Sequence, residues 1–442
     1  MQPSLATRIG AAMCAALLAA LTIGTLPALA AAPSNDDWAA AAPIAALPAT
    51  RHVNTSDATT QAGEPNSLCT DTDFTVWYKL KLDQEAVVLL DLHGSAIESG
   101  VTVWKGSSLA SLDEVACAYG TSGDPAGTRG RVSFRAKAGV RYYIQIVALF
   151  DEGTNDTHGG NVTLKVKRVT PPGNDDFQHA TSVTSFPFHA VANNIKATSQ
   201  PGEPAQGECL NTLATRWFKV HPSQTMTLRA DTLGSPLDTV IAVFSGGPSL
   251  GALDYVACDD DTSSNSNYTF NSSVAWTARA GKTYWVQAGG FDNETGDIDV
   301  TIQRVHPPTN DNRGSARVIP NVTGSPFNHS TNTRNATWQP TETIPETCTG
   351  DGGVGGNSLL QTVWYRYTAP NTSPLKVTLS GAPGVSPVVV VYTGASFATD
   401  VQVVCDEAQL TFAPASGTTY YFQVAGKTGR SGPISFTLEL AP

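Results

Sequence analysis

Three pairs of cysteines recur along this chain of 442 residues and constrain its fold more than any other feature. Matching cysteines lie about 140 residues apart, which is the length of a whole domain and not of a short stacked repeat. One even pair in each copy is typical of one disulfide per domain in an oxidising compartment. The predicted bridges are Cys69–Cys117, Cys209–Cys258 and Cys348–Cys405.

The first 30 residues have the pattern of a secretory signal. Arg8 supplies the positive charge, residues 9–26 are apolar, and Ala28-Leu29-Ala30 is a small-x-small cleavage site. Export would remove Cys14 with this segment and leave six cysteines. No second apolar stretch of membrane-spanning length follows. We therefore expect a secreted protein, without membrane insertion.

The mature chain divides into three copies, at residues 31–170, 171–306 and 307–442, joined by Pro-Pro linkers. Short segments rich in Val, Thr, Tyr and Trp alternate with Gly, Pro, Asn and Asp clusters, which is typical of a β-sandwich. In Val162-Leu164-Val166 and Phe436-Leu438-Leu440 every second residue is apolar, so these closing strands should have one solvated face. The sequence predicts an all-β protein of three tandem sandwiches.

The same motifs follow one another in each copy. In the second copy they are an Asn-Asp-Asp-aromatic run at 174–177, Gly-Glu-Pro at 202–204, an apolar strand at 238–246 and Cys-Asp-Asp-Asp at 258–261. This order resembles the bacterial pre-peptidase C-terminal domain, most closely in the second copy. The resemblance implies a jelly-roll-like sandwich and an exported protein that adheres to protein or polysaccharide, with calcium in some members. The 442 residues themselves contain no recognisable peptidase domain.

The Asn-Asp runs and the Gly-Glu-Pro turns are the candidate metal ligands, because calcium prefers six to eight carboxylate, amide and carbonyl oxygens. The third copy offers only Asn310, Asp311 and Glu342. The alternative is helix capping, with Asn as the N-cap and two acids in the first turn. No other cofactor is predicted. The candidates in the first two copies are Asn35, Asp36, Asp37, Glu64, Asn174, Asp175, Asp176 and Glu203.

Aromatic residues are the other binding candidates. Trp77, Trp217 and Trp364 recur with the copies, so we expect a core role near the disulfide and not a platform for stacking sugars. Aromatic residues beside acidic loops are better placed to contact a ligand. These candidates are Phe150, Asp151, Phe291 and Asp292.

No catalytic constellation emerges. Gly-Pro-Ser-Leu-Gly around Ser249 fits a nucleophile elbow, but a similar turn recurs with Ser108 and Ser396, which favours a scaffold role. The eight histidines form no metal-binding spacing. The net charge of −11, without a basic run, argues against nucleic acid as a partner. We predict a secreted, non-enzymatic protein that binds extracellular protein or polysaccharide. The alternatives are an accessory or spacer for an exported protease, and an unrecognised hydrolase.

Overall fold

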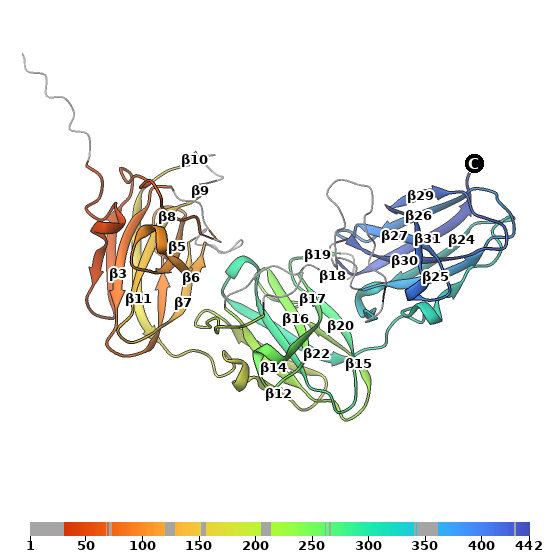
Figure 1. Cartoon of the computed structure of the whole chain (residues 1–442), viewed down its shortest axis with the longest axis horizontal. Coiled ribbons are helices and arrows are strands. Elements are labelled where there is room, and N and C mark those ends of the chain that lie inside the picture. Colours follow the sequence, from red (N-terminus) through yellow and green to blue (C-terminus); the bar gives the residue numbers. More distant parts are fainter. Residues whose placement is uncertain are drawn as a thin grey trace, which may run out of the picture. The chain divides into compact units, whose positions relative to one another are not determined.

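The computed structural model describes residues 31–442 except 68, 70–72, 120–128, 152–155, 205–213, 261, 265–266, 340–341, 343–360 and 428–429. The described chain folds into three β-sandwiches, each made of a five-stranded and a four-stranded sheet (Figure 1). The predicted all-β class is confirmed, and the only helices in the described ranges are short 3-10 turns. The predicted signal segment lies outside the described residues. No described helix is long and apolar enough to span a membrane.

The first sandwich shows the topology that the other two repeat. Its five-stranded sheet has the order β1(Ala42–Ile44), β3(Val76–Lys81), β8(Arg141–Ala148), β5(Ser99–Lys105), β6(Asp113–Ala118). Its four-stranded sheet has the order β2(Ala49–Asn54), β11(Asn161–Val169), β4(Ala86–Asp91), β7(Arg131–Ala136). A small hairpin pairs β9(Phe150–Asp151) with β10(Asp156–Thr157), and the 3-10 turns are η1(Trp38–Ala40) and η2(Leu109–Ser111).

The second sandwich repeats both sheets. The five strands are β12(Thr181–Val183), β14(Arg216–Val220), β21(Tyr284–Gly290), β16(Thr239–Gly246), β17(Leu253–Asp259). The four strands are β13(Phe188–Asn193), β22(Asp297–Arg304), β15(Met226–Asp231), β20(Ser273–Ala278). The remaining elements are β18(Thr262–Ser264) paired with β19(Asn267–Thr269), and the turns η3(Phe177–His179), η4(Leu250–Ala252) and η5(Phe291–Asn293).

The third sandwich has the same order. The five strands are β23(Arg317–Val318), β25(Val363–Thr368), β30(Thr419–Gly426), β27(Pro387–Thr393), β28(Val401–Glu407). The four strands are β24(Phe327–Asn332), β31(Pro433–Leu440), β26(Leu375–Gly381), β29(Gln409–Phe412). The turns are η6(Arg313–Ser315), η7(Thr333–Asn335) and η8(Phe397–Thr399).

Alternation along the strands builds two apolar layers in each sandwich. In β3, Tyr78 and Leu80 enter the main core between the sheets, whereas Trp77 joins a smaller cluster on the outer face of the five-stranded sheet. The pleat sends successive side chains to opposite faces, so one strand can serve both layers. In β11 the alternation leaves Val162 and Leu164 buried and Lys165 exposed, which confirms the predicted solvated face.

A bulge marks the same place in all three five-stranded sheets. The pairing shifts between Val103 and Trp104, between Val243 and Phe244, and between Val391 and Tyr392. An extra residue in one strand re-aims the side chains that follow it. The extra residue is Val115, Val256 or Val403 of the edge strand, so the shared bulge bends the edge strand. The pleat alone carries Trp104, Phe244 and Tyr392 to the outer face.

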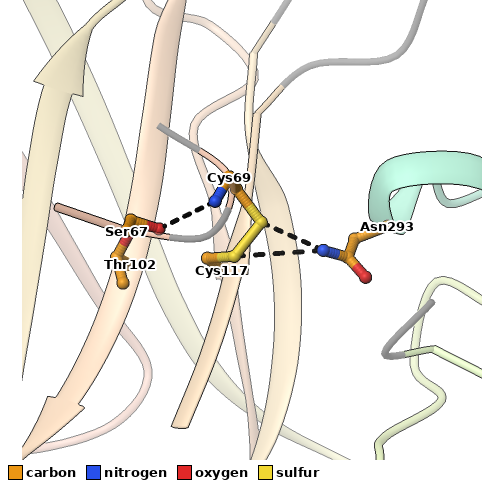
Figure 2. Close-up of a disulfide and its surroundings, with 5 residues drawn as sticks. All are labelled: Ser67, Cys69, Thr102, Cys117 and Asn293. Atoms are coloured by element: carbon orange, nitrogen blue, oxygen red, sulfur yellow. Dashed lines mark hydrogen bonds between the residues drawn. A yellow bond between two sulfur atoms is a disulfide. The ribbon is translucent and has the colours of Figure 1, made fainter. Parts of the chain in front are cut away.

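The first predicted disulfide is present between Cys69 and Cys117, whose Cα atoms are 5.9 Å apart. Ser67 lies beside this bridge, and Figure 2 shows its bond to the Cys69 amide. The Ser67 Oγ accepts from the Cys69 amide at 3.1 Å and from Thr102 Oγ1 at 3.0 Å. Cys258 and Cys405 are also disulfide-bonded. Their predicted partners, Cys209 and Cys348, lie outside the described residues.

Candidate functional site

The segment that opens each copy lies along the first long strand of the five-stranded sheet, and an asparagine fixes it there. Asn35 Nδ2 donates to the carbonyl of Trp77 at 3.0 Å, and the Trp77 amide donates back to the Asn35 carbonyl at 2.8 Å. Asn174 and Asn310 form the same two bonds with Trp217 and Trp364. The first residue of each predicted metal motif is thus a buried structural anchor.

The aspartate that follows binds a threonine and does not cap a helix. Asp175 Oδ1 accepts from the Thr198 amide at 2.6 Å, and its Oδ2 accepts from Thr198 Oγ1 at 2.8 Å. The same pair of bonds joins Asp36 to Thr59 and Asp311 to Thr337. The capping alternative is wrong, because the asparagine is not the N-cap of the turn and no acid lies in the first turn. The N-cap residues are Asp37, Asp176 and Asn312, and they make no side-chain cap bond.

The glutamate of each copy lies in what we call the buried Glu cluster, under the opening segment. In the third copy, Glu342 Oε1 accepts from Trp364 Nε1 at 2.9 Å and Gln423 Nε2 at 3.1 Å, and it also bonds the Thr362 hydroxyl. Its Oε2 accepts from the Gln339 amide at 2.9 Å. Four donors therefore surround one buried carboxylate, and these contacts include no cation.

The other copies build the same cluster. Glu64 accepts from Trp77 Nε1 at 3.1 Å, Thr75 Oγ1 at 3.0 Å and Gln145 Nε2 at 2.9 Å. Glu203 accepts from the matching side chains of the second copy. In both of these turns glycine precedes the glutamate, with φ of +88° at Gly63 and +86° at Gly202, a conformation that favours glycine.

Burial governs the protonation of these acids. It raises the pKa of Glu203 and of Glu342 to about 7, and it raises the pKa of Glu64 in the same direction. Burial also raises the pKa of Asp311 to about 6, against the opposing effect of the Thr337 hydrogen bonds. Desolvation disfavours the charged form of a carboxyl group more than the surrounding donors favour it.

Two glutamines per copy complete the contacts of the opening segment and the buried Glu cluster. In the sequence analysis they have no assigned role. Gln61 Oε1 accepts from the Trp38 amide at 3.1 Å at the start of η1, and Gln200 and Gln339 do the same in their copies. Gln145, Gln287 and Gln423 occupy matching positions in the middle of an apolar strand. Their recurrence inside a buried strand was the signal that could have identified them.

The tryptophan prediction is confirmed. Trp77, Trp217 and Trp364 are fully buried. Trp217 and Trp364 pack in the same clusters as the disulfide cysteines Cys258 and Cys405. Their indole N–H groups are used within the buried Glu cluster, so these rings are not exposed for stacking on a ligand.

Four of the predicted calcium ligands, the carboxylates of Asp36, Glu64, Asp175 and Glu203, are thus already hydrogen-bonded to the protein. Calcium would have to displace donors from Asp36 and Glu64, or from their counterparts in the second copy. Within the described residues no group of three or more His, Cys, Asp or Glu side chains is placed to hold a metal. Calcium binding stays a prediction, to be checked by melting the mature chain in millimolar calcium and in chelator.

Ser249 lies where the scaffold interpretation predicts. It is the N-cap of η4, between β16 and β17, and Ser108 and Ser396 occupy the same place before η2 and η8. In the first and third copies the serine forms a capping box with Ser111 or Thr399. A recurring turn cap accounts for the motif.

The remaining predicted ligand residues are not gathered at one place by any described contact. Phe150 and Asp151 form β9, and Phe291 and Asp292 begin η5. The Phe291 side chain is half-buried, and the side chains of the other three lie outside the described part of the structure. A role for these residues in ligand binding stays a prediction.

An open groove of about 680 Å³ crosses one end of the outer face of the third five-stranded sheet. Val318 and Ile319 form its apolar side, and Tyr421 contributes an aromatic ring. Arg366 is exposed and supplies its cation. Its hydroxyl groups come from Thr368, Thr393, Thr418 and Thr419.

No protein family and no curated protein matches the chain. The solved structures it is similar to include the periplasmic lysozyme inhibitor PliG of Aeromonas hydrophila, at 12% identity, 28% of this chain, 96% of that one and a TM-score of 0.20. The Yersinia pseudotuberculosis-derived mitogen matches at 10% identity, 28% and 88% coverage and a TM-score of 0.18. Tandem CBM51 modules of a Streptococcus pneumoniae family 98 glycoside hydrolase match at 8% identity, over 52% of this chain and 82% of that one, with a TM-score of 0.15. Similarity at this level supports no argument about function.

Proposed function

We propose that the chain is a secreted, non-catalytic protein that binds extracellular polysaccharide through the groove of the third sandwich. The observation that carries the proposal is the lining of this groove. It combines threonine hydroxyl groups and the exposed guanidinium of Arg366 with the half-buried Tyr421, one ring face of which Arg313 covers. Sugars offer hydroxyl groups for hydrogen bonding and apolar C–H faces for contact with aromatic rings, and binding sites commonly pair these features.

The placement of the polar residues supports binding and not turnover. The acids that recur in all copies, Glu64, Glu203 and Glu342, are held by several donors beneath the opening segment and do not line the groove. Catalysis needs a base, nucleophile or metal with an orienting partner beside the substrate. Three linked sandwiches would also add avidity if more than one copy binds. The likeness to the pre-peptidase C-terminal family is part of this proposal.

Binding of the mature chain to dextran, xylan and chitin, measured by biolayer interferometry, tests the proposal. Arg366→Ser and Thr418→Val should each weaken binding to the preferred polysaccharide by about tenfold, the equivalent of roughly 1.4 kcal/mol. Thr411→Val is the matched control, because Thr411 is exposed on β29 of the other sheet. Unchanged binding by both groove variants would contradict the proposal.

The alternatives predict different results. Release of reducing sugar or peptide by the pure chain, lost in Ser249→Ala, would favour a hydrolase. Faster action of an added exported protease, without polysaccharide binding, would favour an accessory role.

A further inference from the structure

The end of the sheet that carries the groove in the third sandwich has a different chemistry in the first. Lys81 and Arg141 lie directly opposite each other on β3 and β8, and both side chains are exposed. Lys79, half-buried, lies two residues earlier on the same face of β3. These three residues form the Lys/Arg patch. It belongs to a protein with a net charge of −11.

In the other copies the same pair of positions holds no lysine or arginine and is hydrogen-bonded. Thr368 and Thr419 face each other in the third sandwich, with their Oγ1 atoms 2.9 Å apart. His221 Nδ1 and Thr283 Oγ1 are 3.1 Å apart in the second. The fold therefore does not require two cations at this place.

A like-charge pair on directly opposed strands destabilises a sheet. Among the described residues, neither Lys81 nor Arg141 makes an ion pair or hydrogen bond that relieves this repulsion. The nearest acids along the chain, Asp83 and Glu85, are exposed in the turn between β3 and β4. The other copies avoid this cost, and a break of a local stability rule is expected at a functional or strained site.

We propose that the Lys/Arg patch binds an anionic polysaccharide, through the carboxylate or sulfate groups of the sugar. The patch has two exposed cations side by side on the outer face of a sheet, with the half-buried Lys79 next to them. A guanidinium binds carboxylate and sulfate oxygens in a forked geometry, whereas an ammonium group acts as a point charge. The choice of a polysaccharide rests on the proposed function, but the patch and the groove are separate surfaces on different sandwiches.

The test compares the mature chain with the double variant Lys81→Thr/Arg141→Thr, which installs the neutral pair of the third sandwich. The probes are alginate for carboxylate, dextran sulfate for sulfate and dextran as the neutral polymer. The variant should bind one or both anionic polymers at least about tenfold more weakly, with a weaker dependence on salt. Its melting temperature should stay equal or rise by a few degrees, which excludes unfolding as the cause.

Lys167→Thr/Arg168→Thr is the matched control, because it removes two exposed cations from β11 of the same sandwich. It should leave binding of the anionic polymers within about twofold, since its charges lie on the other sheet. Equal losses in both double variants, unchanged binding in Lys81→Thr/Arg141→Thr, or binding of duplex DNA in preference to both anionic polymers would overturn the inference. Loss of neutral-polymer binding only in the groove variants would leave it standing, so the two proposals can fail separately.

Discussion

The first and third sandwiches cover the same outer-face tyrosine in different ways. The first uses apolar side chains and the third uses an ion pair. In the first, the Trp38 ring lies 4.9 Å from the Tyr143 ring, and Leu112 packs against the same cluster. In the third, Arg313 takes the place of Trp38 and its guanidinium carbon lies 3.7 Å from the centre of the Tyr421 ring. Asp400 takes the place of Leu112 and pairs with Arg313 at 2.6 Å.

The second sandwich shows which arrangement is shared. Phe177 lies 3.9 Å from Trp285, with Leu253 beside it, so two copies use an aromatic ring with a leucine and one uses an ion pair. A cation can cover an aromatic ring as another ring does, but a buried cation also needs an acceptor. Among the three copies, the residue over the ring is a cation only where the neighbouring leucine is replaced by aspartate.

The largest expected effect comes from breaking the ion pair. Asp400→Leu leaves Arg313 buried without its carboxylate, because these side chains are only 0% and 8% exposed. The third sandwich should lose about 3–5 kcal/mol of stability. Hydrogen exchange of the mature chain, read on peptides of the third sandwich, measures this loss.

The double variant Arg313→Phe/Asp400→Leu transplants the pairing of the second copy and serves as the control. It should recover at least half of the loss, since buried ion pairs are often replaceable by apolar pairs. A single variant that costs less than about 1 kcal/mol would show that the carbonyl groups of Gly394 and Ala395, which Arg313 also bonds, are sufficient partners.

The next largest effect should be a difference between the sandwiches in how their stability depends on pH. Folding raises the pKa of Glu342 from 4.5 to about 7, so the folded state binds more protons between these values. Its contribution to stability is present below pH 4.5 and is lost as the pH rises through 7, by up to about 3 kcal/mol. Glu203 should behave alike.

Unfolding of the mature chain at pH 4.5, 5.5 and 7 tests this sign. Glu342→Gln should make the stability of the third sandwich depend less on pH, because glutamine does not titrate. Glu64→Gln should have a smaller effect on the pH dependence of the first sandwich. Stability of the third sandwich that rises with pH over this window would contradict the prediction.

A smaller effect on stability should come from the aromatic residue that bonds the buried strand glutamine, Gln145 or Gln423. Trp104 Nε1 donates to Gln145 Oε1 at 2.8 Å, and Tyr392 Oη donates to Gln423 Oε1 at 3.1 Å. Phe244 occupies this place in the second copy, and Gln287 Oε1 is buried without a partner among the described residues. Phe244→Tyr should stabilise the second sandwich by about 1 kcal/mol, measured by denaturant unfolding. Tyr392→Phe, the reverse change, should cost a similar amount.

The smallest effect is expected at Trp38. Its Nε1 is buried without a hydrogen-bond partner among the described residues, and the second copy has phenylalanine there. Trp38→Phe removes this unsatisfied donor but also some packing, so the two effects should cancel to within about 0.5 kcal/mol. A loss above about 1 kcal/mol in the same unfolding assay would show that the first copy needs the larger ring.

The sequence by itself determined the repeated architecture. The spacing of Cys69 and Cys117, the alternation around Val162 and the recurring turn at Ser249 each predicted what the structure contains. These features are local or recur with the copies, and recurrence shows that a position matters in every copy. Recurrence does not show what the position contacts, so Asp175 was interpreted as a metal ligand or a helix cap, although it binds Thr198.

Only the tertiary structure decided which of these residues meet. Glu342 and Gln423 are 81 residues apart, and Arg313 and Asp400 are 87 apart. The opening segment brings the first pair together by covering the outer face of the sheet, and the turn after β27 brings the second. Burial then fixes their chemistry, since a carboxylate removed from water must find donors or a cation. No pattern along the chain shows which of these carboxylates folding removes from water.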